Sequence, residues 1–146
     1  QPIAGQAMKA VPGSRPVYTS ANEPGLIYDV LAVSPASAKQ NKAEWAKVVK
    51  VWDRVVHYIN DPKTQPDAVK IMAARVGVTP QVYLPLLKGT HLLSLADGKK
   101  IYVKGPGFAS LHGSSKVADD FNVANGVYKA HQDIDSYLDS SFTNAK

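Results

Sequence analysis

The sequence predicts an α/β fold, because an apolar segment typical of a buried strand leads directly into a series of helices. Residues 25–33 form this segment, which is rich in β-branched and aromatic residues and lies between Pro24-Gly25 and Ser34-Pro35. Apolar residues spaced for one helix face follow between residues 42 and 59. Two further helices join this long helix through short connections, as antiparallel neighbours on a common surface do.

The segment before the predicted strand contains little regular structure. Residues 1–9 predict a short helix with Pro2 near its first position. Residues 17–19 predict a short extended piece, and the turn-forming residues 22–25 lead into the strand.

The predicted long helix has one apolar face. At about 100° per residue, seven apolar side chains fall within an arc of roughly 120°: Trp45, Val48, Val49, Trp52, Val55, Val56 and Ile59. Lys47, Lys50 and Arg54 lie on the opposite side. Each buried apolar side chain contributes about 1.5–3 kcal/mol, so this face needs a partner of similar size, and the preceding strand is the nearest one.

The remaining elements follow from caps and breaks in the pattern. A helix is predicted over residues 64–76, and another over 79–89, in which Pro85 predicts a kink or an early end. Residues 90–104 are ambiguous between helix and strand, with Asp97-Gly98 as a turn signal. A helix over residues 110–125 ends at Gly126, and residues 133–139 predict one or two helical turns.

Composition excludes several classes of protein. The chain has 146 residues, 45% of them hydrophobic, which is enough for one domain with a core. It has no cysteine, so disulfides, thiolate metal sites and cysteine nucleophiles are excluded. The net charge of +5 comes from dispersed Lys and Arg residues, a pattern that favours a solvated surface over nucleic-acid binding.

No local motif predicts catalysis or a metal site. The four histidines, His57, His91, His112 and His131, show neither an HExxH motif nor an i, i+4 pair. Residues 105–116 are glycine-rich but lack the spacing of a phosphate loop, although backbone N–H groups at the start of a helix can still bind an anion. Ser110 and His112 lack the third group of a nucleophilic triad. We expect no catalytic residue, metal or cofactor.

Three residues remain as candidates for ligand contact. Asp29 interrupts the apolar strand; it either ends the strand and bonds a neighbouring N–H, or faces a cleft and binds a cationic group of a ligand. In the second case Tyr28 supplies a hydroxyl on the other side of the strand. His91 follows a predicted helix end and is either a plain loop residue or a contact at the edge of the site.

An ordered series of segments resembles the C-terminal half of the periplasmic substrate-binding proteins for taurine, aliphatic sulfonates, nitrate and thiamine precursors. The resembling segments are residues 24–34, 60–62, 77–80, 121–127 and 134–142. Gln1-Pro2 is similar to the end of the family's Trp-Glu-Pro motif, with Gln in place of Glu. The resemblance covers essentially the whole chain, although each motif is diffuse.

The resemblance implies part of a bilobed type II periplasmic-binding-protein fold, with this chain as its helix-rich C-terminal portion. Residues 1–22 would be a remnant of the second lobe, residues 23–34 the hinge crossover strand, and residues 35–146 the C-terminal part of the first lobe with its terminal helices. Family members are about twice as long, so an N-terminal half of the same protein is expected as a partner. Gln1, Glu23, Tyr28, Asp29 and His91 are the ligand-binding residues that the resemblance and the preceding reasoning imply.

The implied function is that of a non-enzymatic receptor for an ABC importer. Such a receptor is periplasmic, or lipid-anchored outside the cell, and delivers its ligand to a membrane permease. Ligands of this fold bind in a cleft that closes between the lobes. The carboxylate of Asp29 favours a small amine-bearing or zwitterionic ligand, such as taurine or an ω-amino acid like GABA.

Two other hypotheses stay open at this point. An enzyme on the same fold could act on a pyrimidine or thiamine precursor, with its nucleophile or metal in another part of the protein. A helical interaction module would instead fold and stay monomeric alone.

Overall fold

All regular secondary structure that the structure describes is helical. The structure, a computed structural model, describes residues 2–144. Its elements are α1 (Pro2–Ala10), η1 (Ser20–Asn22), α2 (Pro35–Gln40), α3 (Lys42–Asn60), α4 (Gln65–Arg75), α5 (Pro80–Lys88), α6 (Leu95–Ile101), α7 (Leu111–Ala124), η2 (Ile134–Ser136) and α8 (Ser141–Asn144). Because residues 2–144 contain no strand, the predicted α/β fold is wrong.

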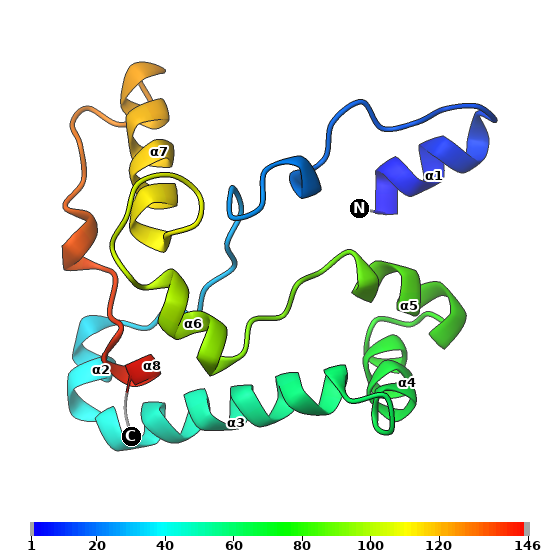
Figure 1. The fold of residues 1–146 in the computed structure, drawn as a ribbon, viewed down its shortest axis with the longest axis horizontal. Helices are drawn as coiled ribbons and strands as arrows, with labels where there is room; N and C mark the ends of the chain where they lie inside the picture. Colours follow the sequence, from blue (N-terminus) through cyan, green and yellow to red (C-terminus); the bar gives the residue numbers. More distant parts are fainter. Residues whose placement is uncertain (1, 145–146) are drawn as a thin grey trace.

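The predicted strand over residues 25–33 is an irregular segment between η1 and α2 (Figure 1). A strand needs a neighbour that accepts and donates its ladder hydrogen bonds, and no second strand exists within the described chain. Ile27, Val30 and Leu31 are exposed as a result. The apolar pattern therefore identified side chains that suit a sheet. It could not show whether a second strand is present to pair with this segment.

Helix predictions made from caps and periodicity are confirmed. The predicted helices over residues 1–9, 42–59, 64–76, 79–89 and 110–125 correspond to α1, α3, α4, α5 and α7. Gly126, at φ +70°, ends α7 as predicted. The alternative of an early end at Pro85 is wrong, because α5 continues through this residue to Lys88.

The ambiguous residues 90–104 contain helix α6, which begins at a capping box. The Ser94 hydroxyl accepts a hydrogen bond from Asp97 N–H (3.2 Å), and the Asp97 carboxylate accepts one from Ser94 N–H (3.3 Å). Two contacts fasten this helix to α3: Trp52 Nε1 donates to Leu93 O (2.9 Å), and Leu95 N–H donates to Asp53 Oδ1 (2.8 Å).

The largest cluster of buried side chains lies where α3 meets α4. Buried apolar residues of α3 are Val56 and Ile59, and those of α4 are Ala68, Val69 and Ala73. The predicted apolar face of α3 is covered less well before Val56: Val48 is 42% exposed and Trp52 is 47% exposed. The C-terminal half of α3 is therefore its stable anchor.

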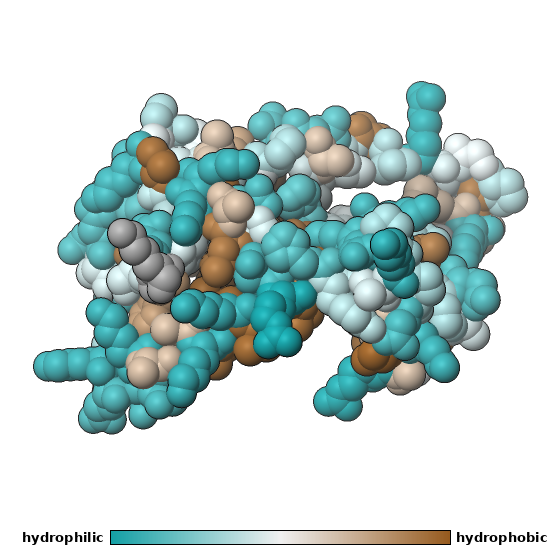
Figure 2. All heavy atoms as spheres, turned by 60° about the horizontal axis from the view of Figure 1, so that its bottom comes forward, coloured by the Kyte–Doolittle hydropathy of each residue, from teal (hydrophilic) through white to brown (hydrophobic). Residues whose placement is uncertain are grey.

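The chain has an open shape. It exposes 11,084 Å², whereas a compact monomer of 15.7 kDa exposes about 7,300 Å². In the ribbon, α1 lies at the end of a long connection away from α3, and α7 lies on the opposite side of the molecule (Figure 1). Apolar residues reach the surface in several separate places (Figure 2). None of the described helices is both long and apolar enough to cross a membrane.

Candidate functional site

An open groove of about 660 Å³ follows one side of α7. Its walls are α7, the loop of residues 104–107 and residues 131–135. The volume lies within the range of small-molecule sites. Most of the polar side chains of the groove are ionisable and include both acidic and basic groups: Lys104, His112, Lys116, Asp119, Asp120, His131, Asp133 and Asp135.

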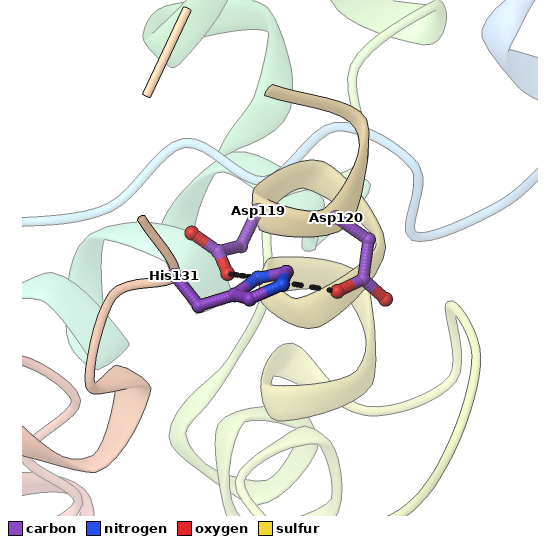
Figure 3. Close-up of side chains that lie close together, drawn as sticks. All are labelled: Asp119, Asp120 and His131. Carbon is purple, nitrogen blue, oxygen red and sulfur yellow. Dashed lines mark hydrogen bonds and ion pairs between the residues drawn. The ribbon is translucent and has the colours of Figure 1, made fainter. Parts of the chain in front are cut away.

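The densest cluster of ionisable groups in the groove joins α7 to the chain that follows it (Figure 3). His131 Nδ1 lies 2.7 Å from Asp119 Oδ2 and 3.5 Å from Asp120 Oδ1. The side chain of Asp119 is only 6% exposed, whereas that of His131 is 60% exposed. The backbone N–H of Gln132 donates to the other oxygen of Asp119 (3.1 Å).

These contacts keep Asp119 ionised although it is buried. Burial by itself raises the pKa of Asp119, but the hydrogen bonds from His131 and Gln132 and the positive charges of His131 and Lys116 outweigh it. The net result is a pKa below the ordinary value for Asp. Asp119 is therefore a fixed negative charge on the inner side of the cluster.

A second cluster lies at the first turn of α7. His112 Nε2 is 3.0 Å from Asp135 Oδ1, and Lys104 Nζ is 2.6 Å from Asp135 Oδ2. The hydrogen bond from Lys104 lowers the pKa of Asp135; partial desolvation acts in the opposite direction, and the nearby charges of Lys104 and His112 add to the lowering. The other ring nitrogen of His112, Nδ1, is buried and has no hydrogen-bond partner.

The donor atoms of Asp119, Asp120 and His131 lie within 4.8 Å of one another, close enough for one cation. Both oxygens of Asp119 nevertheless already accept hydrogen bonds, one from His131 and one from the backbone of Gln132. Asp120 in turn forms an ion pair with Lys116 at 2.9 Å. Since the existing contacts account for these groups, we interpret the cluster as a clamp within the protein and not as a metal centre.

The glycine-rich residues 105–116 close the N-terminal end of α7 tightly. Ser110 Oγ donates to Val103 O (2.9 Å) and accepts a hydrogen bond from Gly105 N–H (3.2 Å), so this hydroxyl is part of the loop and not a free nucleophile. Gly113 faces the backbone of Gly105 and Gly107 at very short range. The loop is therefore packed by its own backbone against the first turn of α7.

The same loop anchors the segment that was predicted to be a strand. Tyr28 donates its hydroxyl hydrogen to Phe108 O (2.9 Å), and Ser114 Oγ donates to Gly25 O (2.7 Å). Gly25 has φ +87°, and a side chain there would overlap the carbonyl of Phe108. These contacts fix residues 25–28 against α7 without any sheet.

The predicted ligand-binding residues are not brought together by direct contacts. Glu23, Asp29 and His91 are exposed, and the half-buried Tyr28 uses its hydroxyl in the anchor to Phe108. No hydrogen bond or ion pair among residues 2–144 links any two of these four. Gln1 lies outside the described residues.

The clusters around α7 were not predicted from the sequence, although one signal was present. The inner side of α7 contains buried or half-buried residues at helical spacing, Leu111, Ser115, Asp119 and Asn122, so Asp119 belongs to this side. A carboxylate there implies a partner, in the same way as Asp29 did in the apolar segment. The partner, His131, lies beyond the helix end, so spacing alone did not identify it.

The clusters predict how stability responds to acid. Asp97, Asp119 and Asp135 each have a native-state pKa below the ordinary value, which is about 3.9 for an unfolded chain. Their contribution to stability is therefore complete above that value and is lost as the pH falls toward the lower native values.

We expect the urea midpoint to be steady from pH 7 to about pH 5 and to fall steeply below about pH 4. Equilibrium urea unfolding followed by circular dichroism at each pH measures this. Asp119→Asn removes one titrating group and should give a shallower acid slope; an unchanged slope would contradict the role of Asp119.

Comparison with protein-family models, with curated proteins and with solved structures found no match to this chain.

Proposed function

We propose that this chain is part of a non-enzymatic, solute-binding receptor of an ABC importer. The sequence resemblance suggests this function, although the α/β fold that it implies differs from the all-helical fold of residues 2–144. The open surface of the structure is the observation that carries the proposal. The chain exposes 11,084 Å², about 3,800 Å² more than the roughly 7,300 Å² of a compact monomer of its mass. A standard protein–protein interface buries about 800 Å² on each partner, so the excess is more than four times that area.

The apolar residues that contribute to the excess lie in several elements. They include Ile3 of α1, Ile27 and Leu31 of the segment before α2, and Val51 and Trp52 of α3. Exposed apolar surface of this kind is available for contact with another polypeptide. In this proposal, the N-terminal half of the same protein covers it, and the complete receptor works with a membrane permease outside the cytoplasm.

The proposed ligand is a small amine-bearing or zwitterionic molecule, such as taurine or an ω-amino acid. Asp29 supplies the negative charge for the amine: its side chain is exposed and follows directly after the anchored residues 25–28. An anchored backbone limits the entropy that a contact residue loses when a ligand binds. Glu23 and His91 are exposed as well and stand as secondary contacts.

The proposal is tested by titration calorimetry. The protein used is the full-length product of the natural reading frame. The panel contains ω-amino acids, sulfonates and pyrimidines, each measured against the same protein preparation. Binding of an ω-amino acid or taurine supports the receptor function. Failure of the whole panel to bind contradicts it.

Replacing Asp29 tests the ligand class. We expect Asp29→Asn to weaken binding of an amine-bearing ligand by about 1–3 kcal/mol, because the ammonium group loses its charged partner. Asp61→Asn, an exposed carboxylate at the end of α3, is the matched control and should leave the affinity unchanged. Equal affinities for Asp29→Asn and the natural protein would show that Asp29 does not contact the ligand.

A helical interaction module is the second candidate, because the all-helical fold favours it. Such a module needs no small ligand and is stable as a monomer. Light scattering coupled to gel filtration separates the two: a well-behaved monomer of this chain alone favours the module, whereas association or aggregation through exposed apolar surface favours the receptor.

A further inference from the structure

Residues 127–138 form a strap that runs back along α7 after the turn at Gly126. The backbone N–H groups of Val127 and Tyr128 both donate to Asn122 O, at 2.8 and 3.2 Å. Further along the strap, the Gln132 N–H donates to Asp119 Oδ1 at 3.1 Å. These backbone hydrogen bonds place the first half of the strap against the C-terminal part of α7.

A second pocket, of about 470 Å³, is lined by both α7 and the strap. Its volume lies within the range of small-molecule sites. The side chains that the argument below uses are Ser115, Asp119 and Asn122 of α7, together with Tyr128, Gln132 and Tyr137 of the strap. The pocket therefore combines one carboxylate, two aromatic rings and several uncharged polar groups.

The carboxylate of Asp119 gives this pocket a negative charge. Burial raises the pKa of Asp119, but its hydrogen bonds outweigh burial, so the net pKa lies below the ordinary value and the group is ionised at neutral pH. Among the described residues that line the pocket there is no Lys, Arg or His. Lys116 and His131, the basic groups nearest to Asp119, line the 660 Å³ groove instead, and Lys116 pairs there with Asp120 at 2.9 Å.

Two tyrosine rings supply the aromatic surface of the pocket. Both are exposed, Tyr137 by 55%, so a molecule from solvent can reach them. Burial raises the pKa of the Tyr137 hydroxyl, a hydrogen bond with Ser115 lowers it, and the neighbouring carboxylates of Asp119 and Asp133 raise it further. Tyr137 thus lies between α7 and two negative charges. The face of an aromatic ring attracts a cation, and a nearby carboxylate adds to that attraction.

We propose that this pocket binds a small organic ammonium ion, with Asp119 as the counter-charge and with Tyr128 and Tyr137 as the aromatic surfaces. Both oxygens of Asp119 already accept a hydrogen bond, one of them pointing to His131 and the other away from it (Figure 3). A metal ion needs oxygen atoms in direct coordination. A methylated ammonium group needs no hydrogen bond and is held by ring faces and by charge at short range.

This site is separate from the proposed receptor contact. Asp29 does not line the pocket, so the ammonium site can be absent while the receptor function holds, and the reverse is also true. The two are distinguished by which residues affect binding, Asp29 in one case and Asp119 with the tyrosines in the other.

An NMR titration of the natural chain tests the site with two probes of matched shape. Choline carries a trimethylammonium group, and the neutral alcohol dimethylbutanol carries a tert-butyl group in its place. Choline should shift the ring signals of Tyr128 and Tyr137 to saturation and bind about 5-fold or more tightly than the alcohol, because only choline is charged. Ring signals that do not saturate with choline, or equal affinities for the two probes, would overturn the proposal.

Three tyrosine variants test the aromatic surface. Tyr137→Leu removes the ring face and should weaken choline binding by about 2- to 5-fold, whereas Tyr137→Phe keeps the face and should bind choline as the natural chain does. Tyr18→Leu is the matched control, because Tyr18 is 59% exposed and lies outside the pocket. The role of the Tyr137 ring is refuted if Tyr137→Leu binds choline as tightly as Tyr18→Leu does, or if Tyr137→Phe loses as much affinity as Tyr137→Leu.

Asp119→Asn tests the counter-charge, since it removes the charge and keeps the shape of the side chain. It should lower the affinity for choline to nearly that for the neutral alcohol. Unchanged choline affinity would show that Asp119 is not the counter-charge. The comparison of the two probes on the natural chain does not depend on how this variant folds.

Discussion

Replacing Val56 by alanine should lower the free energy of unfolding by about 1.5–3 kcal/mol. Val56 is 1% exposed and lies where α3 packs on α4, next to the buried Ile59. The substitution removes two methyl groups and leaves a cavity that the surrounding side chains fill only in part. Equilibrium urea unfolding, followed by the helical signal in circular dichroism, measures the change.

Val55→Ala is the matched control, because it makes the same chemical change at the adjacent position of the same helix. Val55 is 42% exposed, so its replacement should cost less than about 1 kcal/mol. Equal losses for the two variants would mean that the α3–α4 junction is not the stable centre of this chain.

Local signals in the sequence located the helices. These signals involve residues within a few turns of one another, namely Thr79-Pro80, Gly126 and the apolar spacing of α3 and α4. The helices α3, α4, α5 and α7 begin and end close to the residues that these signals predict. The capping box of Ser94 and Asp97 is a local signal as well. This capping box lies within the ambiguous residues 90–104. The pair Asp97-Gly98 is also typical of a turn, and this second signal hides the start of α6 in the sequence.

Non-local pairing could not be predicted in this way. Residues 25–33 have the composition of a strand, yet strand formation depends on a partner strand elsewhere in the chain. The structure instead fixes this segment through Tyr28 to Phe108 and through Gly25 to Ser114, contacts separated by 80 residues or more. Side-chain pattern along one segment contains no information about such partners.

The same limit applies to the candidate site. Glu23, Asp29 and His91 are exposed, and no contact assembles them, so their role in binding stays a prediction. The clusters that the structure does assemble join α7 to the strap, through Asp119 with His131 and His112 with Asp135. They form because the turn at Gly126 reverses the chain. Residues that are 12 positions apart (Asp119 and His131) or 23 positions apart (His112 and Asp135) are thereby brought into direct contact.

Replacing Gly113 by alanine should also destabilise the protein, by about 1–3 kcal/mol, the cost of overpacking a tight contact. An added Cβ at Gly113 would overlap Gly107 O and lie 2.6 Å from both Gly105 O and Gly107 N. These are backbone atoms, which cannot move aside as a flexible side chain can. Because the 105–110 loop also anchors residues 25–28, the loss should extend to the contacts of Tyr28 and Ser114.

Gly5→Ala is the matched control for Gly113→Ala. Both glycines lie within helices, α1 and α7, so each substitution gains up to about 1 kcal/mol in helix propensity. Nothing lies within 4 Å of a Cβ at Gly5, whereas the Cβ at Gly113 meets the loop. Urea unfolding should therefore show Gly5→Ala to be neutral or slightly stabilising and Gly113→Ala to be destabilised. Hydrogen exchange should also show faster exchange in residues 25–28 and 105–110 of the Gly113→Ala variant. If Gly113→Ala were as stable as Gly5→Ala, the loop could not be packed on α7, and the anchor that holds residues 25–28 would lack its base.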